Sequence, residues 1–248
     1  MPARTGEAGI AGLARPGAGT GPGPDIRALD HANLGGTVYL TLSDAIVKGQ
    51  FQPNDRLRIR ELADRLGTSV TPVRDAVLRL VQDRALVMRS SRDIRVPILS
   101  SAEYLEIRTI RMNLEGLAAE TAAATVDADG IAALKDITAR NEQALADGDV
   151  ALATELNQVF HFQLTQIAGM PVLRSILQRL WLQMGPLIGE MYRTAGDEVM
   201  VHHRVLIGAL VERDGKAAAT AIRADILEAG APILARIRRA ERGAAEGR

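Results

Sequence analysis

The stretch RIRELADRLGTSVTPVRDAVLRL, residues 58–80, contains two helical patterns separated by a tight turn. In the first pattern, Leu62, Ala63 and Leu66 form an apolar stripe at helical spacing. Gly67 follows directly, and a glycine after the last helical turn is a typical helix stop. Two short helices joined in this way predict a helix-turn-helix.

The second helix of this stretch has one apolar and one polar face. Ser69 or Thr71 can cap its first turn, and Pro72 fits there because its missing amide hydrogen is not needed. The polar face carries these hydroxyls and Arg74, which are side chains that a recognition helix presents to the major groove of DNA. Periodicity alone also fits a helical hairpin of an ordinary bundle. The apolar face repeats at i, i+3, i+4 and i+7, with Val73, Ala76, Val77 and Leu80.

Length and composition indicate a globular, mainly helical protein. The chain has 248 residues, of which 47% are hydrophobic and only 3% aromatic, so two helical domains are favoured. No apolar run approaches 18 residues, so we expect neither membrane insertion nor secretion and predict a cytoplasmic protein. The absence of cysteine excludes disulfides, thiolate nucleophiles and cysteine-based zinc sites.

Charge is distributed unevenly although the net charge is zero. Residues 36–98 carry 11 basic and 7 acidic side chains, whereas residues 99–248 carry 16 and 20. The basic excess near the N-terminus suits contacts with phosphates, although a solvated surface explains such a mild excess nearly as well.

The region before the helix-turn-helix divides into a tail and one helix. Residues 1–35 are predicted to be flexible because glycine and proline are frequent there and no apolar period is present. A helix is expected from Thr37 to Lys48, with Gly49 as its stop. Residues 50–57 have turn chemistry, and Asn54 can adopt the left-handed conformation that most residues avoid.

A β-hairpin is predicted after the recognition helix. Residues 84–89 and 94–97 alternate apolar and polar side chains on either side of a polar turn at residues 90–93. The tip of this wing is basic, and Arg89, Arg92 and Arg95 could lie along a phosphate backbone or enter the minor groove. An exposed polar hairpin without such contacts is the alternative.

Spaced motifs in residues 42–96 resemble the winged helix-turn-helix of GntR-superfamily transcription regulators. In that family the matching positions contact DNA, which implies roles for Arg60, Ser69, Thr71 and Arg74. Val70 stands where the family usually has an arginine, so the resemblance does not imply the family's usual operator sequence. The motifs are Gly49-x-Phe51-x-Pro53-x-x-x-Leu57, Arg60-Glu61-Leu62-Ala63-x-x-Leu66-Gly67 and Ser69-x-Thr71-Pro72-Val73-Arg74-Asp75-Ala76.

Residues 99–240 are predicted to form an antiparallel bundle of six to seven helices, followed by a flexible C-terminus at residues 241–248. Ser100 and Glu103 have the spacing of a capping box that opens the first of these helices. Short turns with glycine, proline or aspartate separate the rest. The expected helices cover residues 100–125, 127–146, 149–168, 171–193, 197–212 and 216–239.

Polar residues on three of these helices form a candidate metal site. Asn157 and His161 are four residues apart, so both leave the same helix face. With His203 and Asp225 they would suit a divalent metal such as Zn, Ni or Mn. For any single histidine in a helix, an ordinary hydrogen bond is the more common explanation.

Three further motifs resemble the FCD effector domain of the FadR branch of the same superfamily. The resemblance implies Asn157, His161 and His203 as metal ligands, and Arg111 as the group that reaches the carboxylate of a bound effector. The third histidine of the family pattern is missing, and Asp225 occupies its place. The motifs are Arg111-x-x-x-Glu115-Gly116-Leu117-Ala118-Ala119, Asn157-x-x-Phe160-His161 and His203-Arg204.

These motifs together predict a ligand-responsive DNA-binding regulator rather than an enzyme. Repression is expected in preference to activation. We expect a homodimer that binds a double-stranded DNA operator and a small carboxylate metabolite. One alternative is a helical metalloenzyme, although no general base like that of H-E-x-x-H is evident. Another is a constitutive DNA-binding protein whose bundle only dimerises.

Overall fold

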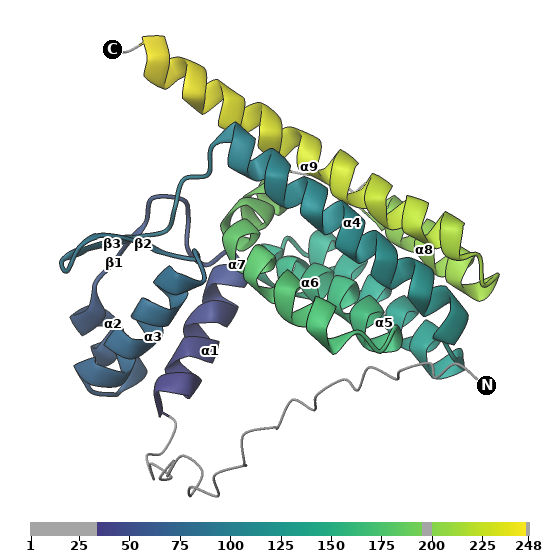
Figure 1. The fold of residues 1–248 in the computed structure, drawn as a ribbon, viewed down its shortest axis with the longest axis horizontal. Helices are drawn as coiled ribbons and strands as arrows, with labels where there is room; N and C mark the ends of the chain where they lie inside the picture. The colour runs from purple at the N-terminus through teal and green to yellow at the C-terminus, as the bar shows by residue number, and fades with distance from the viewer. Residues whose placement is uncertain (1–33, 195–199, 247–248) are drawn as a thin grey trace, which may run out of the picture. The chain divides into compact units, whose positions relative to one another are not determined.

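The computed structural model describes residues 34–194 and 200–246, which are mainly helical (Figure 1). The N-terminal elements form the predicted winged helix-turn-helix. They are α1 (Leu34–Val47), β1 (Arg56–Leu57), α2 (Ile59–Leu66), α3 (Val70–Gln82), β2 (Val87–Ser90) and β3 (Asp93–Arg95).

The turn between α2 and α3 forms as the sequence predicts. Gly67 adopts a left-handed conformation with φ 61°, and its amide bonds to the carbonyls of the preceding turn. Ser69 occupies the N-cap position of α3 in extended conformation, but its side chain makes no capping hydrogen bond, and Thr71 lies inside the helix. The predicted apolar face of α3 is the buried one.

The wing differs from the prediction by an additional strand. The sheet has three strands in the order β1-β3-β2, all antiparallel, with Leu57 paired to Ile94. The two residues of β1 lie in the segment predicted as a turn, since a strand this short shows no alternation. Strand β2 begins at Val87 rather than Arg84, because Arg84 takes a left-handed turn conformation with φ 59° at the end of α3.

Helix α1 begins at Leu34 rather than at Thr37, and it continues through Gly35 and Gly36. Its packing along α3 stabilises a first turn that glycine propensity alone disfavours. The end of the helix agrees with the prediction, since Gly49 has φ 66°. Asn54 also adopts the expected left-handed conformation, with φ 74°. The predicted tail at residues 1–33 lies outside the described residues.

The remaining helices of the described chain form the predicted bundle. Helix α9 lies along α4, and the other helices pack beneath this pair (Figure 1). The capping box is present, because the Ser100 amide donates to Glu103 Oε2 at 2.9 Å and the Glu103 amide donates to Ser100 Oγ at 3.2 Å. The helices are α4 (Ser101–Thr125), α5 (Ala128–Ala146), α6 (Val150–Ile167), α7 (Pro171–Thr194), α8 (Val201–Val211) and α9 (Gly215–Glu246).

One helix end of the bundle differs from the prediction. Helix α9 continues past Arg239 to Glu246, so residues 241–246 are helical where the sequence predicted a flexible end. This last segment is rich in alanine, arginine and glutamate, which favour helix. The predicted start of α8 near Asp197 falls outside the described residues. No described helix is both long enough and apolar enough to cross a membrane.

Candidate metal centre and DNA-binding face

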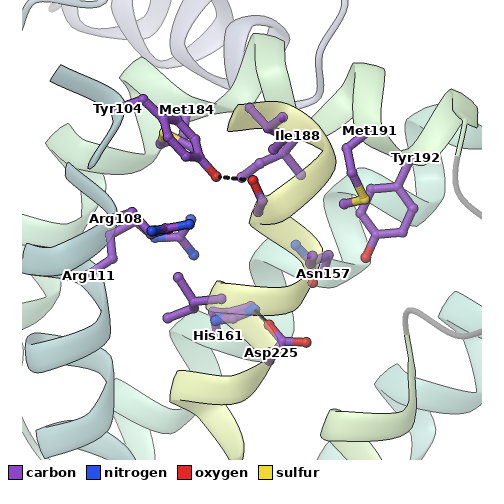
Figure 2. A pocket seen from close by; sticks show the side chains of 14 residues that line it. Tyr104, Arg108, Arg111, Asn157, His161, Met184, Ile188, Met191, Tyr192 and Asp225 are labelled. Carbon is purple, nitrogen blue, oxygen red and sulfur yellow. Dashed lines mark hydrogen bonds and ion pairs between the residues drawn. The ribbon is translucent and has the colours of Figure 1, made fainter. Parts of the chain in front are cut away.

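Three residues predicted as metal ligands lie together inside the bundle. His161 comes from α6, His203 from α8 and Asp225 from α9, and all three are buried. One ligand atom from each lies within 4.8 Å of the others. Asn157, one helical turn before His161, lines the cavity beside this cluster (Figure 2). The structure therefore brings the four predicted ligand residues to one region.

The ring of His161 is oriented by two carboxylates. Its Nδ1 lies 2.5 Å from Glu115 Oε2 on α4, and its Nε2 lies 3.3 Å from Asp225 Oδ2. Because a carboxylate only accepts, Nδ1–H donates to Glu115 and Nε2 is directed toward the cluster. In metal sites, a carboxylate on the second ring nitrogen fixes the tautomer and orientation of a histidine ligand in this way.

Glu115 is the site residue that sequence reasoning left without a role. It also accepts from Arg111 Nε at 2.7 Å, and both side chains are almost fully buried. The Arg111 guanidinium lies 4.3 Å from the centroid of the Trp181 ring. The sequence could have indicated this ion pair, because Arg111 and Glu115 are four residues apart and such residues lie next to each other on a helix.

His203 is the residue of this cluster whose polar atoms have the fewest contacts. Its ring stacks on Phe160 at 3.8 Å between centroids, and neither ring nitrogen has a hydrogen-bond partner among the described residues. Nε2 lies 3.6 Å from Asp225 Oδ1, which is beyond hydrogen-bond range. A buried polar group without a partner costs about 1–3 kcal/mol, and coordination would remove that cost. Two imidazoles and a carboxylate fit a divalent ion such as Zn, Ni or Mn.

The charges of the cluster follow from burial and from the ion pairs. Burial lowers the pKa of His203 to about 4, so this ring is neutral at pH 7. Burial acts on His161 in the same direction, but Glu115 and Asp225 outweigh it and raise the His161 pKa to about 9. Burial alone would raise the pKa of Glu115, but Arg111 and His161 lower it to about 2.

A cavity adjoins the cluster, and Figure 2 shows the side chains around it. Its volume of about 30 Å³ has room for about two water molecules. An organic acid would therefore have to displace some lining side chains. The Tyr104 hydroxyl on this wall donates to the carbonyl oxygen of Gly230 at 2.9 Å. Other lining residues are Arg108, Arg111, Met184, Ile188, Met191 and Tyr192.

The residues predicted to contact DNA are all exposed on the helix-turn-helix and the wing. Arg60 lies in the first turn of α2, Thr71 and Arg74 lie on α3, and Ser69 precedes α3. Arg89 on β2 and Arg92 in the following turn are exposed as well. Within residues 34–194 and 200–246, none of these four arginine side chains forms an ion pair, which leaves their charges available to phosphates or bases.

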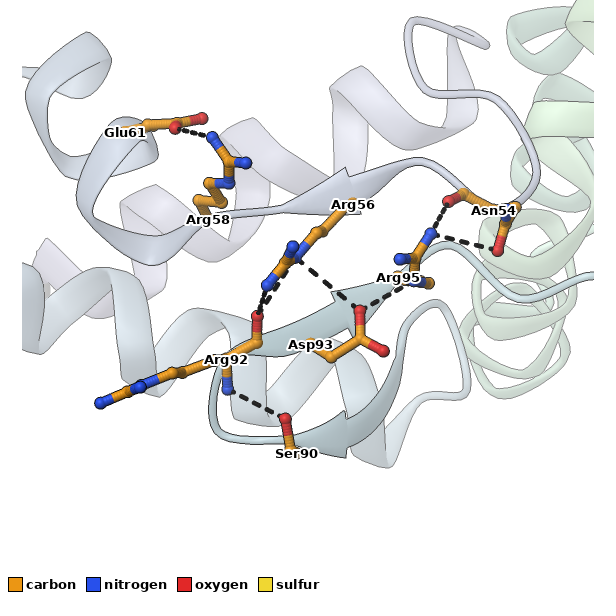
Figure 3. Close-up of polar contacts among 8 residues, drawn as sticks. All are labelled: Asn54, Arg56, Arg58, Glu61, Ser90, Arg92, Asp93 and Arg95. Atoms are coloured by element: carbon orange, nitrogen blue, oxygen red, sulfur yellow. Dashed lines mark hydrogen bonds and ion pairs between the residues drawn. The ribbon is translucent and has the colours of Figure 1, made fainter.

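The other arginines of the wing have structural contacts instead (Figure 3). Arg56 donates to the backbone carbonyl of Arg92 at 2.6 Å, which ties the wing tip to β1. Arg95 pairs with Asp93 at 2.8 Å and donates to the carbonyl of Asn54 at 3.1 Å. Arg56 and Arg95 thus hold the hairpin together, whereas the side chains of Arg89 and Arg92 form no ion pair within the described residues.

Comparison with known proteins agrees with both halves of the chain. Residues 34–96 match the model for bacterial regulatory proteins of the gntR family, and residues 106–228 match the FCD domain model. The chain belongs to the gntR family. It is 29% identical over 195 residues to the HTH-type transcriptional regulator McbR of Escherichia coli K12, covering 77% of this chain and 88% of McbR.

Two further comparisons extend this result. The HTH-type transcriptional repressor GlaR of Escherichia coli K12 is 28% identical over 208 residues, which are 76% of this chain and 90% of GlaR. The solved structure of Escherichia coli McbR/YncC superimposes with a TM-score of 0.78 at 27% identity, over 83% of this chain and 99% of that one. The protein is thus a DNA-binding transcriptional regulator of the GntR type with an FCD domain, and not an enzyme.

Proposed function

We propose that the FCD domain of this regulator holds a divalent metal and binds a small organic acid there, and that this binding controls its affinity for operator DNA. The observation that carries the proposal is the buried cluster of His161, His203 and Asp225, in which no described side chain or backbone group bonds to either ring nitrogen of His203. Buried polar groups are usually hydrogen-bonded, and an ion at the cluster would supply the partner that His203 lacks.

Each residue of the cluster has a distinct part in the proposal. His161 and His203 supply Nε2, Asp225 supplies a carboxylate oxygen, and Asn157 supplies an amide oxygen from the turn before His161. When bound, the metal supplies a Lewis acid with open positions for a carboxylate. Arg111 lines the same cavity and, held in place by Glu115, offers its remaining guanidinium hydrogens to that carboxylate.

DNA binding uses the exposed side chains of the winged domain. Ser69, Thr71 and Arg74 of the recognition helix read bases in the major groove, and Arg60 supports them from α2. Arg89 and Arg92 of the wing contact the backbone. We propose a homodimer on a pseudo-palindromic operator, because one recognition helix reads only a few base pairs. A repressor role is supported by the name of the relative GlaR.

The small cavity favours one competing function, a constitutive DNA-binding protein whose bundle only dimerises. Titration of metal-free protein with Zn²⁺, Ni²⁺ and Mn²⁺, followed by calorimetry, separates the two. We expect the wild type to bind one metal per chain and His203→Ala to lose it. His202→Ala is the matched control, because His202 pairs with Glu228 on the surface and belongs to no cluster. Absence of binding to the wild type would support the constitutive function.

A further inference from the structure

Helix α7 touches α1 through two glycines that allow backbone to contact backbone. A Cβ on Gly185 would lie 2.5 Å from the Cα of Val47 and 2.6 Å from the carbonyl oxygen of Ile46. A Cβ on Gly189, one turn later, would lie 2.9 Å from the Cα of Gly49. No residue other than glycine fits either position without movement of a backbone. We call Gly185 and Gly189 the glycine notch.

The segment seated in the notch is the C-terminal end of α1, the first helix of the DNA-binding domain. Ile46, Val47 and Gly49 are buried there, and α1 packs on its other side against the recognition helix α3. A movement of α7 at the notch can therefore be passed to α3 through α1 alone.

Polar contacts flank the notch on both sides. Lys48 pairs with Glu155 of α6 at 3.1 Å, and Arg193 of α7 donates to Gln52 at 2.5 Å. Such partly exposed contacts contribute little energy, but they restrict how the two segments can slide. The close backbone fit and these contacts define one preferred seating of α1 on α7.

The same turns of α7 line the cavity beside the metal cluster. Met184, Ile188, Met191 and Tyr192 face the cavity, interleaved along the helix with the glycines of the notch. Figure 2 shows these side chains around the cavity. Because the cavity is about 30 Å³ and protein interiors are close-packed, a ligand larger than water must push these side chains aside. The backbone that carries them also carries the notch.

From this arrangement we propose that α7 couples the effector cavity to the DNA-binding domain, with the glycine notch as the contact that transmits the movement. This inference rests on the proposed function, since it requires a ligand in the cavity. It adds a direct route from α7 to α1, beside the chain connection at residues 97–101. A ligand in the cavity favours a shifted position of α1 on α7. The change in operator affinity is set by how much more tightly the ligand binds the shifted arrangement than the original one.

The test compares Gly189→Ala with Gly208→Ala in the full-length protein. Gly208 is the matched control, because it lies within helix α8 and a Cβ there would meet nothing within 4 Å. The probe is Zn²⁺ with acetate, which supplies an ion and a carboxylate. Hydrogen exchange is measured by mass spectrometry with and without the probe, and operator affinity is measured in parallel.

In the wild type and in Gly208→Ala, we expect the probe to change protection both in residues 177–192 and in residues 42–50. Operator Kd should change by about fivefold or more, as is typical of allosteric coupling. In Gly189→Ala, residues 177–192 should still respond, whereas residues 42–50 should not, and the change in Kd should fall below about twofold.

Two results would overturn the inference while leaving the proposed function intact. One is calorimetric binding of the probe to the wild type with no response in residues 42–50. The other is a response of residues 42–50 that is as large in Gly189→Ala as in the wild type. If Gly189→Ala does not fold, the wild-type exchange data decide alone, because a response limited to residues 97–105 contradicts transmission through the notch. If the wild type binds no probe, both proposals fail.

Discussion

At the scale of single residues, the cluster of His161, His203 and Asp225 depends on Glu115, which lies outside the predicted ligand set. Its carboxylate joins Arg111 to His161, and it thereby holds both the proposed effector-binding group and a proposed ligand. We predict that Glu115→Gln weakens metal affinity by about 10- to 100-fold, the usual cost of losing such an outer partner. Metal competition titration measures this, with the exposed Glu120→Gln on the same helix as control. Equal affinities would mean that Glu115 does not orient His161.

A second residue-scale prediction concerns protons. The pKa of His161 is raised to about 9, so in the metal-free protein its ring is protonated on both nitrogens at pH 7, whereas the ring of His203, with its pKa lowered to about 4, is neutral. Metal binding should release about one proton, and affinity should fall about tenfold per pH unit from pH 8 to pH 5. Calorimetry in two buffers of different ionisation heat counts this proton. Binding without proton release would contradict the assigned charges.

The residues of the cluster could be predicted from sequence, but the side chains that hold them in place could not. Asn157 and His161 stand four residues apart, and His203 and Asp225 lie on two later predicted helices. The resemblance to the FCD domain supports Asn157, His161 and His203, whereas Asp225 replaces the family's third histidine. The contact of His161 with Glu115 joins residues 46 positions apart, so no local pattern reveals it.

At the scale of elements, local chemistry predicts the ends of helices well. The capping box of α4 and the glycine stops of α1 and α2 form as expected, because each depends on residues within one turn. Strand β1 was missed because its two residues become a strand only by pairing with β3. The glycine notch on α7 could not be predicted either, because it also depends on a distant segment. The sequence of a helix does not reveal which backbone packs against its glycines.

Replacing two glycines of the bundle by alanine should change the free energy of unfolding in opposite directions. Gly208→Ala should raise the free energy of unfolding by about 0.5–1 kcal/mol, because alanine favours helix and the site is open. Gly185→Ala should lower it by about 1–3 kcal/mol, because the new Cβ overlaps the backbone of α1. Urea unfolding of both variants tests this. A stabilised Gly185→Ala would show that α1 does not contact α7 closely.

At the scale of the whole molecule, the proposed DNA-contacting residues and the proposed ligand site lie in separate parts of the chain. Arg74→Ala should abolish specific operator binding, and Arg60→Ala should weaken it by about 1–3 kcal/mol if the guanidinium makes a bidentate base contact. Arg140→Ala removes the same charge from an exposed position of the bundle and serves as control. Gel-shift titrations at one salt concentration provide the comparison. Wild-type binding by both winged-domain variants would mean that α3 does not read the operator.

In the proposed mechanism, a metal-dependent ligand site in the bundle controls DNA binding by the winged domain. The most direct measurement is operator release by Zn²⁺ and a panel of small organic acids, with the metal content of each preparation determined by elemental analysis. We predict that wild type carries or takes up metal and responds to at least one acid. His161→Ala should bind operator normally but lose both metal and response. A response by His161→Ala equal to that of the wild type, or a wild type that binds no metal, would contradict the claim.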